Sequence, residues 1–303
     1  MTLPTPVPSP DPTALSPAYS APETSLARVS RLPQLTVSSS LALLYLTLLV
    51  VVAVFAPYLA PHNPSAIDLA DPFHPPSLGS HLLGTDQFGH DELSQLIFGT
   101  RYSLLAALIG TSVAVFLGTP LGMLTGYLGR RFETALSFFN DSLMAIPSLI
   151  LVLAVIAVIG KGLPRAMLVV GIVFSPPFFR LARAATKEVK EETFIEASRS
   201  IGCAPRRTLL RHIMPNALTP IIVQASFAAG ASVAAEAGLS FLGLGVVPPS
   251  ASWGTMLMSA GENLYSGPYL VYFPGVAIAL TVLSFFLLGD WLRDGLGAGK
   301  YGR

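Results

Sequence analysis

The sequence predicts an all-α membrane protein with six transmembrane helices and a pair of short cytoplasmic helices between the fourth and the fifth. Hydrophobic residues make up 52% of the 303-residue chain and charged residues only 12%, with a mean hydropathy of +0.62. Soluble domains are about 25% charged, so this composition indicates a membrane protein. The apolar residues form continuous runs, which favour spanning helices over the alternating strands of a barrel.

Four segments follow from this pattern. Residues 1–38 form a tail rich in Pro, Ser and Thr, which we expect to be disordered because it can bury little apolar surface. Residues 39–101 hold the first span and an extracytoplasmic loop. Residues 102–296 form the core with five further spans, and residues 297–303 form a second cytoplasmic tail.

The first apolar run, Leu41–Ala60, contains no charged residue and is long enough to cross a hydrocarbon core of about 30 Å at about 1.5 Å per residue. Its long polar lead predicts an uncleaved anchor and not a signal peptide. The other spans are expected at Tyr102–Leu128, Leu143–Gly160, Ala166 to Phe179 or Leu181, Ala217–Val247 and Tyr269–Leu288.

The basic residues predict the orientation of the spans. If the first span starts in the cytoplasm, only Arg101, Lys161 and Arg165 of the 18 Lys and Arg residues fall outside. Cytoplasmic loops carry an excess of these residues, so we expect both termini to be cytoplasmic. The net charge of +1 gives no reason to expect nucleic acid as a partner. The single cysteine, Cys203, excludes an internal disulfide.

Residues 187–214 are charged and yet patterned as two short helices. We expect Thr186 to cap the first, Lys187 and Glu191 to pair within it, and Gly202 to end it with a positive φ. Pro205 suits the start of the second helix, and Pro215 marks the entry to the fifth span. The alternative is a solvated loop that only sets the topology.

The sequence of this stretch resembles a known motif, and three other stretches of the chain agree with it. Glu196-Ala197-Ser198, then Gly202, then His212-Ile213-Met214-Pro215 resembles the EAA loop of membrane subunits of ATP-binding-cassette importers. The general pattern ends in Ile-x-Leu-Pro, and this chain has His212 and Met214 at the Ile and Leu positions. A histidine there, with Pro215-Asn216 after it, is similar to the peptide and nickel branch of that family. Three other stretches resemble the same branch: LGTDQFGHDELSQLIFGTRYSLL from Leu83, GLSFLGLGVVPPSASWGTML from Gly238, and LLGDWLRDGL from Leu287.

The resemblance covers about residues 41–296 and is to the C-type permease of dipeptide, oligopeptide or nickel importers. One departure is His90, where the family usually has Arg, so a role assigned to that Arg is not carried over.

The resemblance implies that the helix pair docks on a cytoplasmic ATPase. The residues it implies for this coupling are Phe194 as an apolar anchor, together with Glu196, Ala197, Ser198, Gly202, His212 and Pro215. It further implies a second homologous permease, two ATPase subunits that bind ATP and Mg²⁺, and an extracytoplasmic solute-binding protein. This chain then has no cofactor of its own, is not an enzyme, and lies in the lipid of a bacterial inner membrane. Di- and oligopeptides are the expected cargo, with nickel or another small solute as the alternative.

Two features of the spans are candidates for packing or for the pathway. Gly118, Gly122 and Gly126 form a ridge of small residues that predicts close packing against a neighbouring helix or the partner permease, unless it only provides flexibility around Pro120. Glu236 is an acid within the fifth span, expected to line the pathway, to bind a neighbouring helix or, less expectedly, to contact a substrate amine.

Other chemistries are less favoured. Four of the five histidines, His62, His74, His81 and His90, lie in the outer loop, but their spacing matches no metal-binding template and we expect no metal site. The phosphate-binding GxxxxGK[ST] and the HExxH motif are both absent, which argues against ATP use by this chain and against an intramembrane enzyme. An ion-coupled secondary transporter is the main rival, but no internal repeat is visible.

Overall fold

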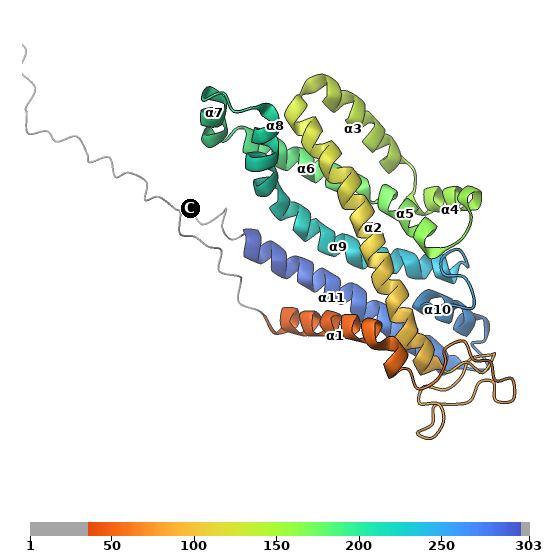
Figure 1. The fold of residues 1–303 in the computed structure, drawn as a ribbon. Helices are drawn as coiled ribbons and strands as arrows, with labels where there is room; N and C mark the ends of the chain where they lie inside the picture. Colours follow the sequence, from red (N-terminus) through yellow and green to blue (C-terminus); the bar gives the residue numbers. More distant parts are fainter. Residues whose placement is uncertain (1–35, 298–303) are drawn as a thin grey trace, which may run out of the picture.

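The computed structural model describes residues 36–297, apart from the side chains of residues 130–132, and the regular secondary structure of this part of the chain is helical (Figure 1). Only one isolated bridge, between Thr85 and Asp91, pairs extended segments within it. The predicted tails of residues 1–38 and 297–303 lie almost wholly outside the described residues. The long helices are α1 (Val37–Leu59), α2 (Glu92–Leu128), α3 (Arg130–Ala145), α4 (Ser148–Ile159), α5 (Leu163–Val173), α6 (Ser175–Lys190), α9 (Met214–Phe241) and α11 (Tyr272–Gly297).

Five helices, or continuous helix pairs, are long and apolar enough to cross a membrane, and one bent pair brings the number to six if it counts as one span. That pair corrects the predicted third span. Instead of one helix over Leu143–Gly160, α3 and α4 meet at 91°. The break falls at Ile146, which is extended because Pro147 disfavours a helical conformation at the residue before it.

Several predicted boundaries are also wrong. The second span begins at Glu92 and not at Tyr102, because the Asp91 carboxylate caps its first turn by accepting from the Ser94 amide at 2.9 Å. The fifth span ends at Phe241, well before Val247. A short outer helix that the sequence did not suggest, α10 (Trp253–Glu262), starts at a reciprocal cap between Ser252 and Thr255.

Helix α2 is the centre of the bundle, with α5, α6 and α9 packed along it and α1 beside it, while α11 packs against α9 and α1 (Figure 1). Much of the outer surface of α1 remains apolar and exposed, for example at Leu44, Leu48 and Val54. An apolar helix surface of this kind is favourable in contact with lipid and unfavourable in contact with water.

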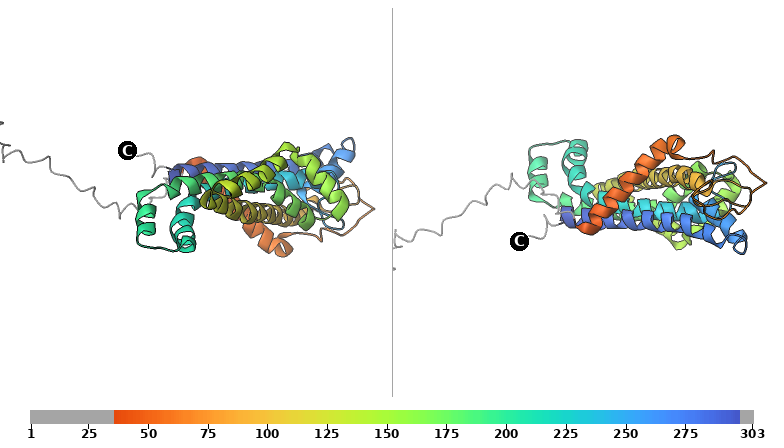
Figure 2. Two further views of the ribbon diagram at one scale, coloured as in Figure 1. Left: turned by 90° about the horizontal axis from the view of Figure 1, so that it is seen from above. Right: turned by 90° about the horizontal axis from the view of Figure 1, so that it is seen from below.

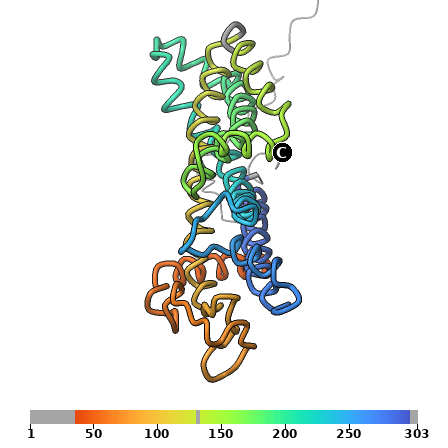
Figure 3. The backbone as a smooth tube through the Cα atoms, turned by 90° about the vertical axis from the view of Figure 1, so that its right-hand side faces the viewer, coloured from red at the N-terminus to blue at the C-terminus, as the bar shows by residue number. Residues whose placement is uncertain are grey.

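The two ends of the molecule differ. The start of α1 and the end of α11 lie at the end from which residues 193–213 project (Figure 2). Residues 61–91 and α10 cover the opposite end, so that the loop and the projecting hairpin are at the two extremes of the long axis (Figure 3).

Candidate functional site

A helical hairpin projects from one end of the bundle (Figure 2). Its first arm is α7 (Thr193–Ser200), and its second arm consists of α8 (Pro205–Arg207) and the π-helical turn η1 (Thr208–Ile213), which runs directly into α9. A helix pair between the fourth and fifth spans was predicted. The expectation of a start at residue 187 was wrong, because α6 continues through a fully buried Thr186 to Lys190.

The predicted roles of the residues at both ends of this helix pair are also wrong. Thr186 caps nothing, and Lys187 pairs with Glu133 of α3 at 2.5 Å and not with Glu191. Pro215 does not interrupt the second arm. A proline clashes with the carbonyl four residues before it, and the wider π-helical turn that immediately precedes Pro215 accommodates this without ending the helix.

The turn between the arms depends on Gly202. Its φ is +78°, as predicted, and its amide donates to the Arg199 carbonyl at 2.9 Å. The Cys203 amide then donates to the Ser198 carbonyl at 3.1 Å, so the last carbonyls of α7 are paired. Because only glycine adopts this conformation readily, Gly202 determines how the second arm folds back.

Helix α7 has two distinct faces. Ile195 and Ser198 point inward, and Ile195 is fully buried. Phe194, Ala197 and the C-cap residue Ile201 lie at i, i+3 and i+7 and so share a second, exposed face about a quarter turn away. Ile201 is 85% exposed and Phe194 46% exposed, so this face carries two large apolar side chains in contact with solvent. Glu196 is also exposed, but it points away from Phe194 and Ile201.

The inward face joins the hairpin to the spans. Ile195 of α7 and Ile213 of η1 belong to one buried cluster with Met123 of α2, Val189 of α6 and Ile221 of α9. A close-packed cluster of this kind moves as a unit, so a displacement of α7 is passed to three helices.

A second contact ties the hairpin to the end of α2. The Arg199 guanidinium lies over the Tyr127 ring at 5.8 Å from its centroid, and Lys190 donates to the Tyr127 carbonyl at 3.0 Å. Neither Tyr127 nor the outward Ile201 was among the predicted site residues, because both roles depend on which faces meet.

The glycine ridge of α2 packs against α6 of the same chain. A methyl group added to Gly118 or Gly122 would collide with the backbone carbonyl oxygens of Ser175 and Phe179, and one at Gly126 would lie 2.8 Å from the Arg183 carbonyl oxygen. Helix α2 is continuous through Pro120. The ridge therefore lies against a neighbouring helix, and this contact extends to the root of the hairpin.

Glu236 lies within the protein and not at an open surface, with 1% of its surface exposed. Its Oε1 accepts from the Ser240 hydroxyl at 2.6 Å, and the Ser240 oxygen accepts from the Val246 amide at 3.1 Å. The side chain thus helps to hold the segment after α9 against the bundle. Trp253, at the far end of that segment, donates from Nε1 to the Leu96 carbonyl of α2 at 3.0 Å.

Two cavities follow one side of α9. The first, of about 590 Å³, lies between α6, α9 and the end of α11 and is lined by Glu188, Pro215 and Arg293 among others. The second, of about 470 Å³, lies between the α3–α4 bend, the start of α6 and α9. Gln224 and Phe227 line both, so the cavities adjoin at these two residues. Gln224 was not predicted as a site residue.

A family model described as the inner membrane component of binding-protein-dependent transport systems matches residues 118–299. The chain belongs to this family. A second model, the N-terminal TM domain of oligopeptide transport permease C, matches residues 40–76. The resemblance inferred from the sequence is thereby confirmed, and the chain is a multi-pass permease subunit of an ATP-binding-cassette importer.

Curated relatives agree with this assignment over most of the permease. It is 38% identical to a probable D,D-dipeptide transport system permease of Escherichia coli K12, over 86% of both chains. It is 37% identical to a dipeptide transport system permease of Alkalihalophilus pseudofirmus, over 84% of this chain and 83% of the relative. A glutathione transport system permease of Pectobacterium atrosepticum is 39% identical over 84% of each.

A solved structure shows the same fold. An inward-facing structure of the MetNI methionine ABC transporter contains a chain that matches with a TM-score of 0.55 at 20% identity, over 67% of the permease and 97% of that chain.

His90, at the position where the family usually has Arg, contacts a neighbouring carboxylate. His90 Nδ1 lies 2.8 Å from Asp86 Oδ2, and Asp86 Oδ1 accepts from the amides of Phe88 and His90. His90 therefore makes a polar contact to the aspartate of the LGTD segment in this permease.

The predicted coupling residues fall into two groups. Phe194, Glu196 and Ala197 are exposed residues of α7, and the inward-facing Ser198 and the turn residue Gly202 lie nearby. His212 and Pro215 lie at the base of the second arm, where Pro215 lines the first cavity.

Proposed function

We propose that this permease forms half of the translocation pathway of an importer for di- or oligopeptides and transmits the action of two cytoplasmic ATPases through the α7 hairpin. The observation that carries the proposal is the two-sided α7. Its outward face presents Phe194, Ala197 and Ile201, while its inward Ile195 shares a buried cluster with three spans. A docked partner can therefore move spans that it does not touch.

The cargo and the remaining partners follow from the relatives. Their names specify dipeptides, D,D-dipeptides, di- and tripeptides and glutathione, which favours short peptides over nickel. A second permease completes the pathway, a solute-binding protein delivers the peptide, and ATP with Mg²⁺ is bound by the ATPases and not by this chain. The hairpin and both termini lie on the cytoplasmic side of a bacterial inner membrane, in agreement with the basic residues of α6, α7 and η1.

The two cavities along α9 are the candidate lining of the pathway. Their shared Gln224 offers a neutral amide that can both donate and accept hydrogen bonds, as a peptide bond requires. Glu236 serves instead to hold the outer segment in place, because its carboxyl is buried within the chain and its Oε1 accepts from Ser240.

The test is peptide uptake by proteoliposomes that contain the permease, its partner permease, the ATPases and the binding protein. Glu196→Lys should leave the complex assembled but lower ATP-driven uptake about 5- to 150-fold, the range of typical coupling free energies of about 1–3 kcal/mol. Glu191→Lys, the same charge reversal at an exposed residue outside α7, is the matched control and should transport normally.

Normal uptake by Glu196→Lys would remove this residue from the coupling surface. A pull-down that recovers the chain alone, from vesicles that still transport without ATP, would instead support the ion-coupled transporter. Uptake of Ni²⁺ that short peptides do not compete for would overturn the peptide assignment and leave the coupling mechanism intact.

A further inference from the structure

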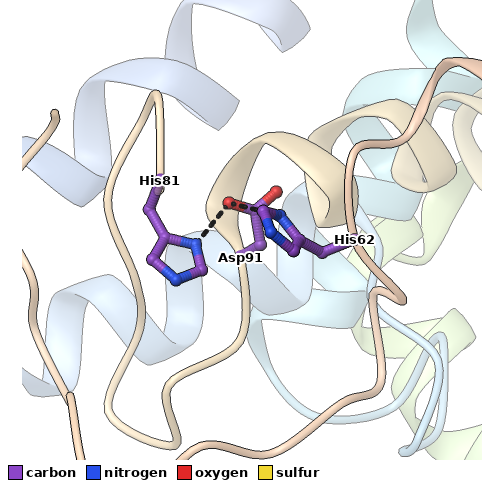
Figure 4. A group of neighbouring side chains, drawn as sticks. All are labelled: His62, His81 and Asp91. Atoms are coloured by element: carbon purple, nitrogen blue, oxygen red, sulfur yellow. Dashed lines mark hydrogen bonds and ion pairs between the residues drawn. The ribbon is translucent and has the colours of Figure 1, made fainter. Parts of the chain in front are cut away.

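Three side chains from separate parts of the outer loop meet at the start of α2 (Figure 4). His62 follows the end of α1, His81 lies in the middle of the loop, and Asp91 caps α2. The Nδ1 atoms of His81 and His62 lie 2.9 Å and 3.6 Å from the same Asp91 oxygen, Oδ1. One ligand atom from each of the three residues lies within 4.8 Å of the others.

The two oxygens of Asp91 have separate partners. Oδ2 accepts from the amide and the hydroxyl of Ser94, at 2.9 Å and 2.6 Å. Oδ1 is left to face the two imidazoles. The Ser94 hydroxyl oxygen also accepts from the His62 amide at 3.0 Å, so Ser94 positions the backbone of one histidine as well as the carboxylate. This arrangement holds the cluster in place independently of any ion.

We propose that His62, His81 and Asp91 bind a first-row transition metal ion of the Zn²⁺ type. Two imidazole nitrogens and a carboxylate oxygen are a donor set that suits Zn²⁺ and its neighbours. Metal–ligand bonds of about 2.0–2.1 Å in a tetrahedral site place the donor atoms roughly 3.3 Å apart. The observed 2.9 Å and 3.6 Å lie on either side of this value.

The remaining edge, between the two histidine nitrogens, is at most 4.8 Å long. The His62 side chain is 45% exposed and can rotate, whereas Asp91 is buried and held by Ser94. The same exposure leaves an entry path for the ion and a fourth position for water. Binding needs neutral imidazoles and releases any proton that His81 shares with Asp91.

An ion at this site would connect the end of α1 to the start of α2. At present Arg101 of α2 makes such a link by donating to the carbonyls of Ala53 and Val54 in α1 at 2.6 Å and 3.2 Å. The three ligands are far apart in the sequence, and their proximity results from the folding of the loop, so their spacing resembles no known template. The expectation of no metal site is therefore revised by this proposal.

The nearby His90–Asp86 pair provides the control, because it has the same histidine–carboxylate contact without a second imidazole on the carboxylate. The full-length permease, freed of its affinity tag and of metal, would be titrated with Zn²⁺ in nanodiscs by calorimetry near neutral pH. We expect one equivalent to bind. His81→Ala and His62→Ala should bind at least about tenfold more weakly, since even the loss of outer partners of metal ligands costs about 10–100-fold. His90→Gln should bind as the wild type does.

Asp91→Asn guards against a folding defect, because asparagine retains the helix cap and loses the ligand charge. It should remain folded without Zn²⁺, because its side-chain oxygen can still accept from Ser94, and lose the tight binding. Co²⁺, as a second probe, should give the intense visible absorption of a tetrahedral site in the wild type and not in the three ligand variants. Absence of saturable binding, or binding unchanged in both His81→Ala and Asp91→Asn, would mean that the histidines are only hydrogen-bonding partners of Asp91.

Discussion

Gly122→Ala tests whether the close approach of α2 and α6 stabilises the permease. The added methyl group would collide with the Phe179 carbonyl oxygen and lie 3.0 Å from the Ala182 methyl group. A backbone carbonyl within a helix cannot rotate away, so the two helices must separate. Overpacking of this kind costs typically about 1–3 kcal/mol, and a contact with backbone belongs in the upper part of that range.

The substitution also has a stabilising contribution, because alanine has a higher helix propensity than glycine, by about 1 kcal/mol. The net loss is then roughly 1–2 kcal/mol, which corresponds to a fall in Tm of about 2–8 °C at 2–4 °C per kcal/mol. Gly238→Ala in α9 measures this helix-propensity contribution alone, since no atom lies within 4 Å of its added methyl group. It should leave Tm unchanged or raise it.

The assay is thermal unfolding of the purified permease in detergent, followed by the fluorescence of its two tryptophans, of which Trp253 is buried and donates to the Leu96 carbonyl of α2. Gly122→Leu should be worse than Gly122→Ala, because a larger side chain forces a wider separation. A Tm for Gly122→Ala at or above that of the wild type would refute the argument that the ridge is held against α6.

Three further predictions concern the hairpin. Gly202→Ala places a side chain at a φ of +78° with no steric obstacle nearby, so the strain of about 1–2 kcal/mol is purely conformational; ATPase binding to the permease should weaken, and Gly202→Asn should weaken it less. Ile201→Lys removes exposed apolar surface without affecting the core, and should reduce co-purification of the ATPase but leave Tm unchanged; equal recovery would exclude this face from docking. The hydrogen bond from Ser198, with the help of Thr208 and the charge of Arg207, lowers the pKa of the Cys203 thiol. Because the thiolate is the reactive form, maleimide labelling should reach its half-maximal rate below about pH 8.5, and Ser198→Ala should raise that midpoint.

The sequence alone was sufficient for features that depend on neighbouring residues. Length and hydropathy located the five spans other than the third approximately, the distribution of Lys and Arg predicted their orientation, and the EAA stretch identified the family. The positive φ at Gly202 also followed from its place after a short helix. Pro147 was a visible signal for the bend between α3 and α4, and the continuous apolar run around it concealed its effect.

Tertiary structure decided everything that depends on which faces meet. Only the packed bundle shows that the Gly118–Gly126 ridge contacts α6, that Ile195 joins the hairpin to three spans, and that Gln224 lines two adjoining cavities. The same holds for His62, His81 and Asp91, which are brought together by the fold of a loop without regular structure. Hydropathy and helix propensity are local properties and can be read along the chain, whereas these contacts join residues distant in sequence and exist only once the helices have packed.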